Sequence, residues 1–211
     1  RYAPRVEPAG QPAFEIELDE TVERLVGELG DSLPASPSRD EILGIARDSY
    51  RPGETLSGAF ARLLSTFLPD LVVLDPSDPA LKKLMAPVLA REIRESSPSS
   101  RLALEAGEAL LRAGYHQQVP VREGFLNLFV LMEGGRRALA LGDAGVEVRG
   151  LGRKLSLSEA ERLVGDEPRL WSANALLRPI AQDAMLPTAA YVGGPAEIAY
   201  HAQIGSAYAH F

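Results

Sequence analysis

The stretch LNLFVLMEGGRRALAL, residues 126–141, is the clearest structural signal in this sequence. Two runs of strand length, Leu126 to Leu131 and Arg136 to Leu141, flank Glu133-Gly134-Gly135. A short glycine turn between two apolar runs favours a β-hairpin. Val146 to Arg149 offers a third short strand directly after the hairpin. We therefore predict an antiparallel β-meander over residues 117–150.

The residues before the meander indicate an α/β pattern. Thr55 to Phe67 carries apolar residues at three- and four-residue steps, as one face of a helix requires. Leu71 to Leu74 is a continuous apolar run, which is typical of a strand covered on both faces. Asp78 followed by Pro79 is a helix cap followed by a first-turn proline. The order helix, buried strand, helix predicts an α/β fold into which the meander is inserted.

After the meander, the pattern returns to helix, strand and helix. Ser156 and Glu159 have the spacing of a capping box. Asn174 to Leu186 is ambiguous, and we expect an extended piece followed by a short helix from Ile180. Thr188 to Val192 predicts a small strand, and the glycine turn after it leads into a final helix that begins at Pro195. The expected organisation is 1–116 as the helical and α/β part of the core, 117–155 as the β insertion, and 156–211 as the return to the core.

Composition excludes several classes of protein. The chain has 211 residues, with 29 acidic against 22 basic side chains and no cysteine. An acidic balance does not fit a protein that wraps nucleic acid or binds a membrane surface. The lack of cysteine excludes a disulfide scaffold and a thiolate metal site. Without an apolar run of membrane length or a signal peptide, we expect a cytoplasmic protein. Because the chain begins at Arg1 rather than Met, we also expect it to be a piece of a longer protein.

Residues 189–200 form the best local candidate for a ligand site. The glycines Gly193 and Gly194 precede Pro195, at which the final helix should begin. A helix N-terminus presents unpaired N–H groups, so this turn could hold a phosphate, a carboxylate or a ribose. The alternative is a tight turn that needs glycine for steric reasons only. Glu197 argues partly against an anion, because its carboxylate can occupy the same N-terminus. Glu197 and His201 lie on one face, but no third ligand is evident, so no metal is predicted.

A polar group inside the apolar stretch 174–186 is the second candidate. Arg178, Gln182 and Asp183 must be either hydrogen-bonded or functional in such surroundings. Two interpretations remain open: a functional site, or Arg178 and Asp183 paired with each other or with the backbone.

Other candidates are polar residues beside predicted strands. Asp75 and Asp78 follow the buried strand, where sites of α/β proteins collect. Arg122 and Asn127 precede or open the hairpin, and turn chemistry is the simpler explanation for them. For Asp78 the simpler explanation is a helix cap.

Taken together, these stretches resemble the cysteine ligase family of bacillithiol biosynthesis, BshC. The order and spacing agree from about Phe14 to Phe211. The segments that carry the resemblance are Tyr50-Arg51-Pro52-Gly53-Glu54-Thr55-Leu56, Leu74-Asp75-Pro76-Ser77-Asp78-Pro79, Gly114-Tyr115-His116-Gln117-Gln118-Val119, Val121-Arg122-Glu123-Gly124, Asn174-Ala175-Leu176-Leu177-Arg178-Pro179, and Tyr191-Val192-Gly193-Gly194-Pro195-Ala196-Glu197-Ile198-Ala199-Tyr200.

The resemblance implies a function and a set of site residues. Members of the family are assigned the last step of bacillithiol synthesis, the addition of L-cysteine to glucosaminyl malate. The resemblance further implies a Rossmann-like core and a homodimer of the intact chain. The motifs do not settle how the carboxyl group is activated, and an adenosine nucleotide, ATP or ADP, is the natural expectation. We expect Arg178 and Asp183 to act in catalysis. The residues expected to bind substrate or nucleotide are Asn174, Gln182, Gly193, Gly194, Pro195, Glu197, Tyr200, Asp75, Asp78, Arg122 and Asn127.

The sequence also departs from the family pattern. A Thr-Gly-Gln-Gln type segment, a Glu-Asp-His-Asp type segment and a C-terminal coiled coil, all typical of the family, are absent here. These parts should supply some of the active site and most of the dimer contact. We therefore expect this chain to correspond to the central portion of a ligase and to need the rest of the family chain as a partner. The alternative is a non-catalytic ligand-binding or scaffolding fragment.

Overall fold

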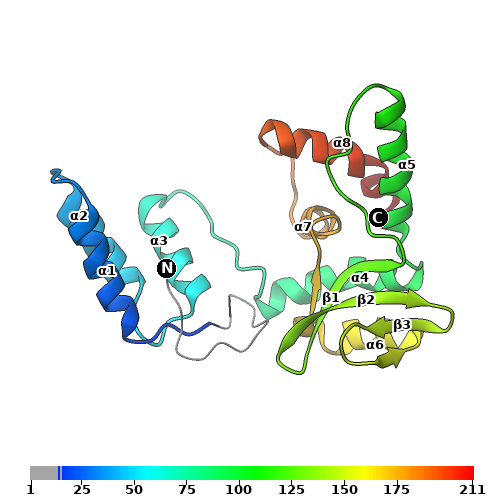
Figure 1. Ribbon diagram of the computed structural model, residues 1–211, viewed down its shortest axis with the longest axis horizontal. Helices are drawn as coiled ribbons and strands as arrows, with labels where there is room; N and C mark the ends of the chain where they lie inside the picture. The colour runs from blue at the N-terminus through cyan, green and yellow to red at the C-terminus, as the bar shows by residue number, and fades with distance from the viewer. Residues whose placement is uncertain (1–13, 15) are drawn as a thin grey trace. The chain divides into compact units, whose positions relative to one another are not determined.

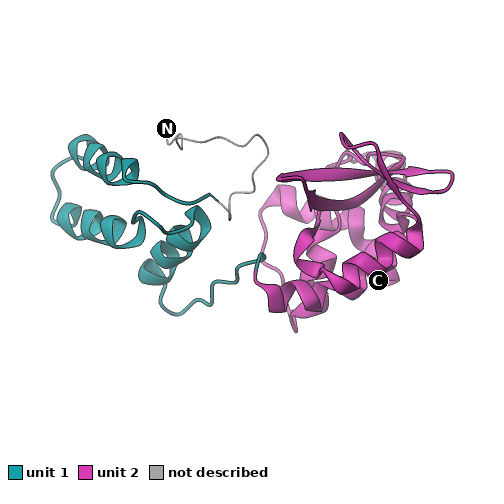
Figure 2. Ribbon diagram, turned by 90° about the horizontal axis from the view of Figure 1, so that it is seen from below, with its two compact units in different colours: residues 1–77 teal, residues 78–211 magenta. Residues whose placement is uncertain are grey.

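The computed structural model describes residues 14 and 16–211, and the chain divides into two compact units. Unit 1 covers residues 1–77 and unit 2 covers residues 78–211 (Figure 2). The boundary falls at Asp78, the residue that caps the first helix of unit 2. The three-part division at residues 116 and 155 stays a prediction.

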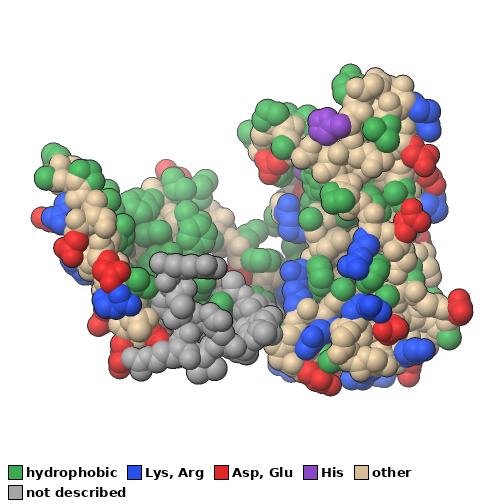
Figure 3. All heavy atoms as spheres, viewed as in Figure 1, with side chains coloured by type: hydrophobic (Ala, Val, Ile, Leu, Met, Phe, Trp, Pro, Cys, Tyr) green, Lys and Arg blue, Asp and Glu red, His purple; other side chains and the backbone are tan. Residues whose placement is uncertain are grey.

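Unit 1 is helical in its described part. Its helices are α1 (Thr21–Ser32), α2 (Arg39–Ser49) and α3 (Leu56–Phe67). Thr55 caps α3 as expected, because its side chain accepts a hydrogen bond from the Gly58 N–H. One small buried cluster consists of Leu18, Val22 and Ala59, and Val26, Leu43 and Ala46 are buried as well. On the face seen in Figure 3, hydrophobic side chains gather over α3, so this unit leaves much of its apolar surface exposed.

The predicted buried strand at Leu71 to Leu74 is wrong. These residues lie outside every helix and strand, and Val72 is 85% exposed. An apolar run forms a strand only when another strand satisfies its backbone groups. The described part of unit 1 contains no sheet to supply such a partner, and Pro69 and Pro76 flank the run. The expected parallel-type core strand is therefore replaced by a connecting segment.

Unit 2 contains a five-stranded sheet in the order β4-β3-β2-β1-β5, and every neighbouring pair is antiparallel. The strands are β1 (Phe125–Met132), β2 (Gly135–Gly142), β3 (Gly145–Val148), β4 (Arg153–Leu155) and β5 (Trp171–Ala173). The predicted meander is confirmed as β1 to β3. Its two-residue turn is Glu133-Gly134, and both residues have positive φ, which suits the twist of a hairpin.

The edge strand β5 was not predicted, because three residues give too little periodicity to recognise. Long-range contacts hold it beside β1. Leu128 pairs with Ala173, and the buried Lys82 ammonium donates to the Trp171 carbonyl at 2.6 Å. The Arg136 guanidinium lies over the Phe129 ring at 3.9 Å and donates to the Ala173 carbonyl at 3.2 Å. Tertiary contacts therefore define this strand.

The helices of unit 2 are α4 (Pro79–Arg94), α5 (Pro98–Arg112), α6 (Leu157–Asp166), α7 (Arg178–Met185), α8 (Pro195–His210) and the short 3₁₀ helix η2 (Pro168–Leu170). Of these, α4 and α6 pack against the sheet as a second layer, and α8 packs against α5 (Figures 1 and 2). The main core lies between the layers, where Leu89 and Ile93 of α4 meet Leu128, Val130 and Leu139 of the sheet. The chain is thus a mixed α/β protein, as predicted. No helix in the described part is long and apolar enough to cross a membrane.

Two details between α7 and α8 differ from expectation. The segment Thr188 to Val192 is not a strand, and Val192 is 96% exposed. It has no strand partner and spans the gap between two helices. Helix α7 begins at Arg178 rather than Ile180, because Pro179 falls in the first turn, where its missing N–H removes no helical hydrogen bond. The capping box of Ser156 and Glu159 at α6 is confirmed.

These assignments predict which apolar residues stabilise unit 2. Leu128→Ala empties a position that is 1% exposed, and we expect it to lower the free energy of unfolding by about 2–5 kcal/mol. Val192→Ala, the matched control, should change it by less than about 0.5 kcal/mol. Urea unfolding followed by the fluorescence of the single tryptophan, Trp171, measures both. A large loss of unfolding free energy for Val192→Ala would contradict the exposed position of Val192 and support the strand predicted at Thr188 to Val192.

Candidate functional site

A cluster of polar and aromatic side chains lies where α7 and α8 approach the loop between β5 and α7. We call it the α7–α8 cluster. It consists of Arg178, Gln182, Asp183, Tyr191, Glu197, Tyr200, His201 and Tyr208. Figure 1 shows α7 beside the ribbon that leads into α8. The structure therefore brings together Arg178, Gln182, Asp183, Glu197 and Tyr200, which were predicted as site residues from two separate stretches.

Arg178 is the cation of the cluster. Its side chain is exposed, and its Nη1 donates to Gln182 Oε1 at 3.0 Å, one helical turn further on. Its positive charge favours the ionised form of Glu197, and it acts in the same direction on the Tyr200 and Tyr208 hydroxyls. An internal pair between Arg178 and Asp183, one of the two interpretations left open by the sequence, is not among the hydrogen bonds or ion pairs of the described residues. The guanidinium thus keeps donors that a carboxylate or a phosphate can use.

Asp183 faces the interior side of the cluster. Its Oδ1 accepts a hydrogen bond from the Thr188 hydroxyl at 2.9 Å. The Tyr208 hydroxyl is buried, and burial together with the Asp183 carboxylate raises the pKa of Tyr208. Tyr208 therefore stays protonated at neutral pH and presents a donor, whereas Asp183 presents an acceptor.

Glu197 occupies the N-terminus of α8. Its Oε2 accepts from the Gly194 N–H at 2.9 Å, and its Oε1 accepts from the Tyr191 hydroxyl at 2.8 Å. These two hydrogen bonds, the backbone one first, lower the pKa of Glu197. Because this carboxylate already takes the Gly194 donor, the turn has the tight-turn character that was the alternative to an anion cradle. A Cβ on Gly193 would lie 2.7 Å from the Tyr191 ring, so the turn requires glycine there.

Tyr200 joins α8 to the loop before α7. Its hydroxyl donates to the Ala175 carbonyl, and burial raises the pKa of Tyr200 to about 12. The His201 ring lies next to it and packs against Tyr191 at 4.5 Å and Tyr208 at 5.8 Å between ring centroids. An aromatic group therefore backs the charged side chains and shields one side of the cluster from water.

The two predicted asparagines meet beneath this loop. Asn174 Nδ2 donates to Asn127 Oδ1 at 2.6 Å, and the Asn174 N–H donates to the Asn127 carbonyl at 2.9 Å. Asn127 is 4% exposed, and its Nδ2 is taken by Ser99 and Ser100. The side-chain groups of Asn127 are thus all used inside the protein, so its contribution to a site is structural.

Three other predicted residues make local contacts of their own. Asp75, in unit 1, accepts from the N–H and hydroxyl of Ser77. Asp78 caps α4 through the Ala80 and Leu81 N–H groups, which confirms the simpler explanation for it. Arg122 stacks over the Phe125 ring at 3.9 Å. Pro195 is the exposed first residue of α8, and its role is to begin that helix.

Sequence reasoning missed Glu92, Tyr191 and Tyr208. Glu92 had a usable signal, because it follows Val88 by four residues and therefore falls on the predicted buried face of α4. A charged residue on that face must find partners. Tyr191 and Tyr208 had none, since nothing in the sequence reports that α8 folds back over the segment before it.

Hollows and metal sites do not add to this picture. Two surface hollows occur in unit 2, one lined by Ser96, Arg101 and Phe125 and another by Lys83 and Pro168. Neither is lined by a residue of the α7–α8 cluster. Within residues 14 and 16–211, no three His, Asp or Glu side chains gather as metal ligands would. The cluster brings together one cation, Arg178, two carboxylates and tyrosine hydroxyls.

Unit 2 is thus a mixed α/β unit whose polar cluster joins α7 to α8. A family model described as "Bacillithiol biosynthesis BshC, N-terminal Rossmann-like domain" matches residues 5–211. The chain belongs to the BshC family. The resemblance inferred from the sequence is thereby confirmed, and the match assigns the chain to the N-terminal domain of the family protein.

Curated relatives agree with the family match. The chain is 38% identical over 196 residues to a protein of Koribacter versatilis, 37% over 210 residues to one of Salinibacter ruber, and 39% over 180 residues to one of Solibacter usitatus. Each of these relatives bears the name "Putative cysteine ligase BshC". The alignments cover 92%, 98% and 84% of this chain but 36%, 38% and 33% of the relatives. The chain thus spans little more than a third of the relatives' length.

The hydrogen bonds of Glu197 make a prediction about its titration. Tyr191→Phe removes one donor, so the pKa of Glu197 should rise toward its ordinary value but stay below it, because the Gly194 N–H remains. The stability carried by Glu197 is present above its unfolded-state pKa and is lost as pH falls through the lower folded-state pKa. NMR titration of the glutamate side-chain carbons measures the shift.

Tyr115→Phe is the matched control for this titration, since Tyr115 is 67% exposed and far from α8 in the sequence. An unchanged Glu197 midpoint in Tyr191→Phe would show that the hydroxyl does not bind the carboxylate in solution.

Proposed function

We propose that this chain is the part of a ligase that helps add L-cysteine to glucosaminyl malate in the last step of bacillithiol biosynthesis. The observation that carries the proposal is the family match over residues 5–211, together with curated relatives at 37–39% identity that bear a cysteine-ligase name. The α7–α8 cluster supports it from the chemical side, because its charged groups suit substrates that carry both carboxylates and amines. A cytoplasmic location would fit such a biosynthetic step.

The proposed reaction forms one C–N bond between the cysteine carboxyl carbon and the amine of glucosaminyl malate. The carboxyl group must first be activated as a phosphate ester or anhydride, and the C–O bond to that phosphate breaks as the C–N bond forms. The neutral attacking amine gives up one proton to a carboxylate or to water. Negative charge develops on the remaining oxygen and needs a nearby cation or donor. Arg178 is the group that we propose for this role or for holding a substrate carboxylate, since a guanidinium can donate two parallel hydrogen bonds.

The carboxylates of the cluster would act on the amine. Asp183 has an oxygen beyond the one that Thr188 binds, so it can accept a hydrogen bond from an ammonium or a hydroxyl group. One Glu197 oxygen accepts from the Gly194 N–H and the other from the Tyr191 hydroxyl. We therefore assign Glu197 first to stabilising the turn rather than to binding substrate. We therefore propose Arg178 and Asp183 as the pair in contact with the reactants, with Gln182 and Tyr200 beside them.

The Gly193-Gly194 turn is poorly suited to a nucleotide phosphate. The turn that was the candidate for phosphate binding, Gly193-Gly194, gives its Gly194 N–H to Glu197, and a second anion there would be repelled. ATP or ADP therefore stays an expectation of the family resemblance, and we assign no residue of this turn to it. The remaining parts of the family protein, and its homodimer, would supply the other contacts of the reaction.

One observation favours a second function, a ligand-binding or scaffolding part without catalysis of its own. The chain covers only 33–38% of the length of the three relatives above. Calorimetry of this chain with glucosaminyl malate, with L-cysteine and with ATP distinguishes binding from no binding. A coupled assay for the amide product distinguishes binding from turnover.

The proposed site makes a prediction about binding. Arg178→Ala should weaken the binding of glucosaminyl malate by roughly 10- to 100-fold, because a charge-assisted hydrogen bond is worth about 1.5–3 kcal/mol. Asp183→Asn should weaken binding of the amine-bearing substrate in the same way. Isothermal titration calorimetry with the 211-residue chain measures both.

Arg162→Ala is the matched control, because Arg162 is an exposed arginine paired with Asp166 on α6, outside the cluster. Equal affinities for wild type, Arg178→Ala and Arg162→Ala would contradict the assignment of the site to the α7–α8 cluster.

A further inference from the structure

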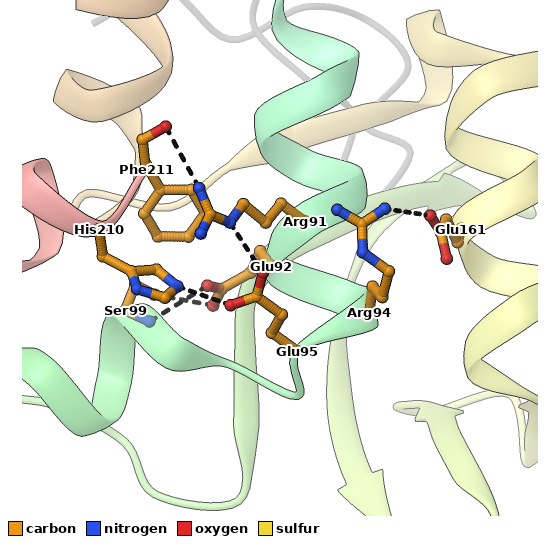
Figure 4. Close-up of polar contacts among 8 residues, drawn as sticks. All are labelled: Arg91, Glu92, Arg94, Glu95, Ser99, Glu161, His210 and Phe211. Atoms are coloured by element: carbon orange, nitrogen blue, oxygen red, sulfur yellow. Dashed lines mark hydrogen bonds and ion pairs between the residues drawn. The ribbon is translucent and has the colours of Figure 1, made fainter.

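A buried carboxylate sits at one end of the polar contacts that lead to the α7–α8 cluster. Glu92 of α4 is fully buried (0% exposed). It accepts hydrogen bonds from the Ser99 hydroxyl at 2.8 Å, the Ser97 hydroxyl at 3.0 Å and the Asn127 N–H at 3.2 Å. Figure 4 shows Glu92 and Ser99 directed toward one another where α4 passes into α5. Because all of these partners donate, Glu92 acts purely as an acceptor.

The carboxylate sets the direction of a chain of hydrogen bonds. The Ser99 hydroxyl gives its single proton to Glu92, so its oxygen can only accept from the next group, which is Asn127 Nδ2 at 2.7 Å. With its Nδ2 held there, Asn127 turns its Oδ1 toward Asn174 Nδ2, at 2.6 Å. Asn174 in turn directs its Oδ1 to the N–H groups of Leu176 and Leu177, at 2.9 and 3.2 Å.

The last step of this relay organises the start of α7. The Leu176 and Leu177 N–H groups precede the helix and would otherwise lack partners. Only the oxygen of the Asn174 amide can accept from them, so the amide orientation matters. The Asn174 carbonyl also accepts from the Arg178 N–H at 2.9 Å. On the other side of the same loop, the Tyr200 hydroxyl of α8 donates to the Ala175 carbonyl.

We propose that Glu92 is a positioning residue for the α7–α8 cluster. Acting through Ser99 and Asn127, it fixes the orientation of the Asn174 side-chain amide, which holds loop 174–177. This loop in turn positions Arg178, which follows it directly, and Tyr200, which donates to the Ala175 carbonyl. The effect on substrate rests on the proposed function, whereas the effect on the loop does not. Hydrogen bonds that all donate in one direction toward a charge polarise and strengthen one another. The Glu92 charge can therefore influence the orientation of an amide that it does not contact directly.

Amide hydrogen exchange of the 211-residue chain tests the relay without any ligand. Ser99→Ala removes the hydroxyl that lies between the Asn127 side chain and Glu92, at a fully buried site where alanine fits, and leaves Ser100 as the remaining acceptor of Asn127 Nδ2. Glu92→Gln removes the charge with little change of shape. Either variant should speed exchange at Leu176 and Leu177 by roughly three- to tenfold, because a hydrogen bond contributes about 0.5–1.5 kcal/mol. NMR exchange rates at single amides give the answer.

A control variant separates this local effect from general destabilisation. Ser156→Ala removes the cap of α6, which lies in the same unit but has no bond to the relay. It should speed exchange in α6 and leave the ratio of rates at Leu176 and Leu177 to those elsewhere unchanged. If Ser99→Ala and Glu92→Gln leave Leu176 and Leu177 unchanged, or speed all amides of unit 2 equally, the proposal is overturned.

A rescue variant addresses the amide orientation itself. Asn174→Asp places an oxygen toward Leu176 and Leu177 in either orientation, because both carboxylate oxygens accept. In the Asn174→Asp background, Ser99→Ala should therefore no longer speed exchange at these two amides. Equal acceleration in both backgrounds would show that the relay does not act through the orientation of residue 174.

Ligand affinity supplies the functional arm. If the wild-type chain binds glucosaminyl malate or L-cysteine, Ser99→Ala should raise the dissociation constant about threefold, and the rise should shrink in an Arg178→Lys background. An undiminished rise there would overturn the link between the relay and Arg178. If the wild-type chain binds neither molecule, the proposed function fails for this chain, while the exchange rates still decide the role of Glu92 in the loop.

Discussion

The contact between Asn127 and Asn174 is the interaction on which the rest of unit 2 depends. It joins a central strand to the residue that follows the edge strand, and it does so with a side-chain and a backbone hydrogen bond. On one side lie the serines and the buried Glu92 at the α4–α5 junction. On the other side lie the first residues of α7 and the loop before it, to which the Tyr200 hydroxyl donates a hydrogen bond. Sheet, helical layer and cluster are thus connected through two amide groups.

Local patterns predicted those elements whose formation is decided by neighbouring residues. The hairpin around Glu133-Gly134, the capped starts of α3, α4 and α6, and the proline start of α8 follow from turn and cap chemistry. The strand expected at Leu71 to Leu74 did not form, because strand formation needs a distant partner that hydropathy does not report. Strand β5 is the opposite case, because its sequence shows no strand periodicity and yet it forms. Contacts with Lys82, Arg136 and β1 stabilise it.

The site could be predicted in part, for the same reason. Arg178, Gln182 and Asp183 are close in sequence, so their grouping on α7 was visible in the sequence. Their association with Glu197 and Tyr200 required the chain to reverse between α7 and α8, which only the fold shows. Glu197 and Asn127, both expected to contact ligand, satisfy backbone or side-chain groups of the protein, and their contact with a ligand stays a prediction. Polar residues that stabilise a site and those that bind its ligand look alike in a sequence.

The wide separation of β1 and β5 along the chain has a kinetic consequence. Leu128 pairs with Ala173, so a loop of more than forty residues must close before the edge strand can join the sheet. The hairpin of β1 and β2 closes through two residues and can form within microseconds. Closing the long loop between β1 and β5 is slower, because its conformational entropy is lost before the stabilising contacts between the two strands form. Trp171 is almost fully buried in that edge strand. Its fluorescence during refolding therefore reports the slow, non-local assembly of unit 2 and not the early formation of its meander.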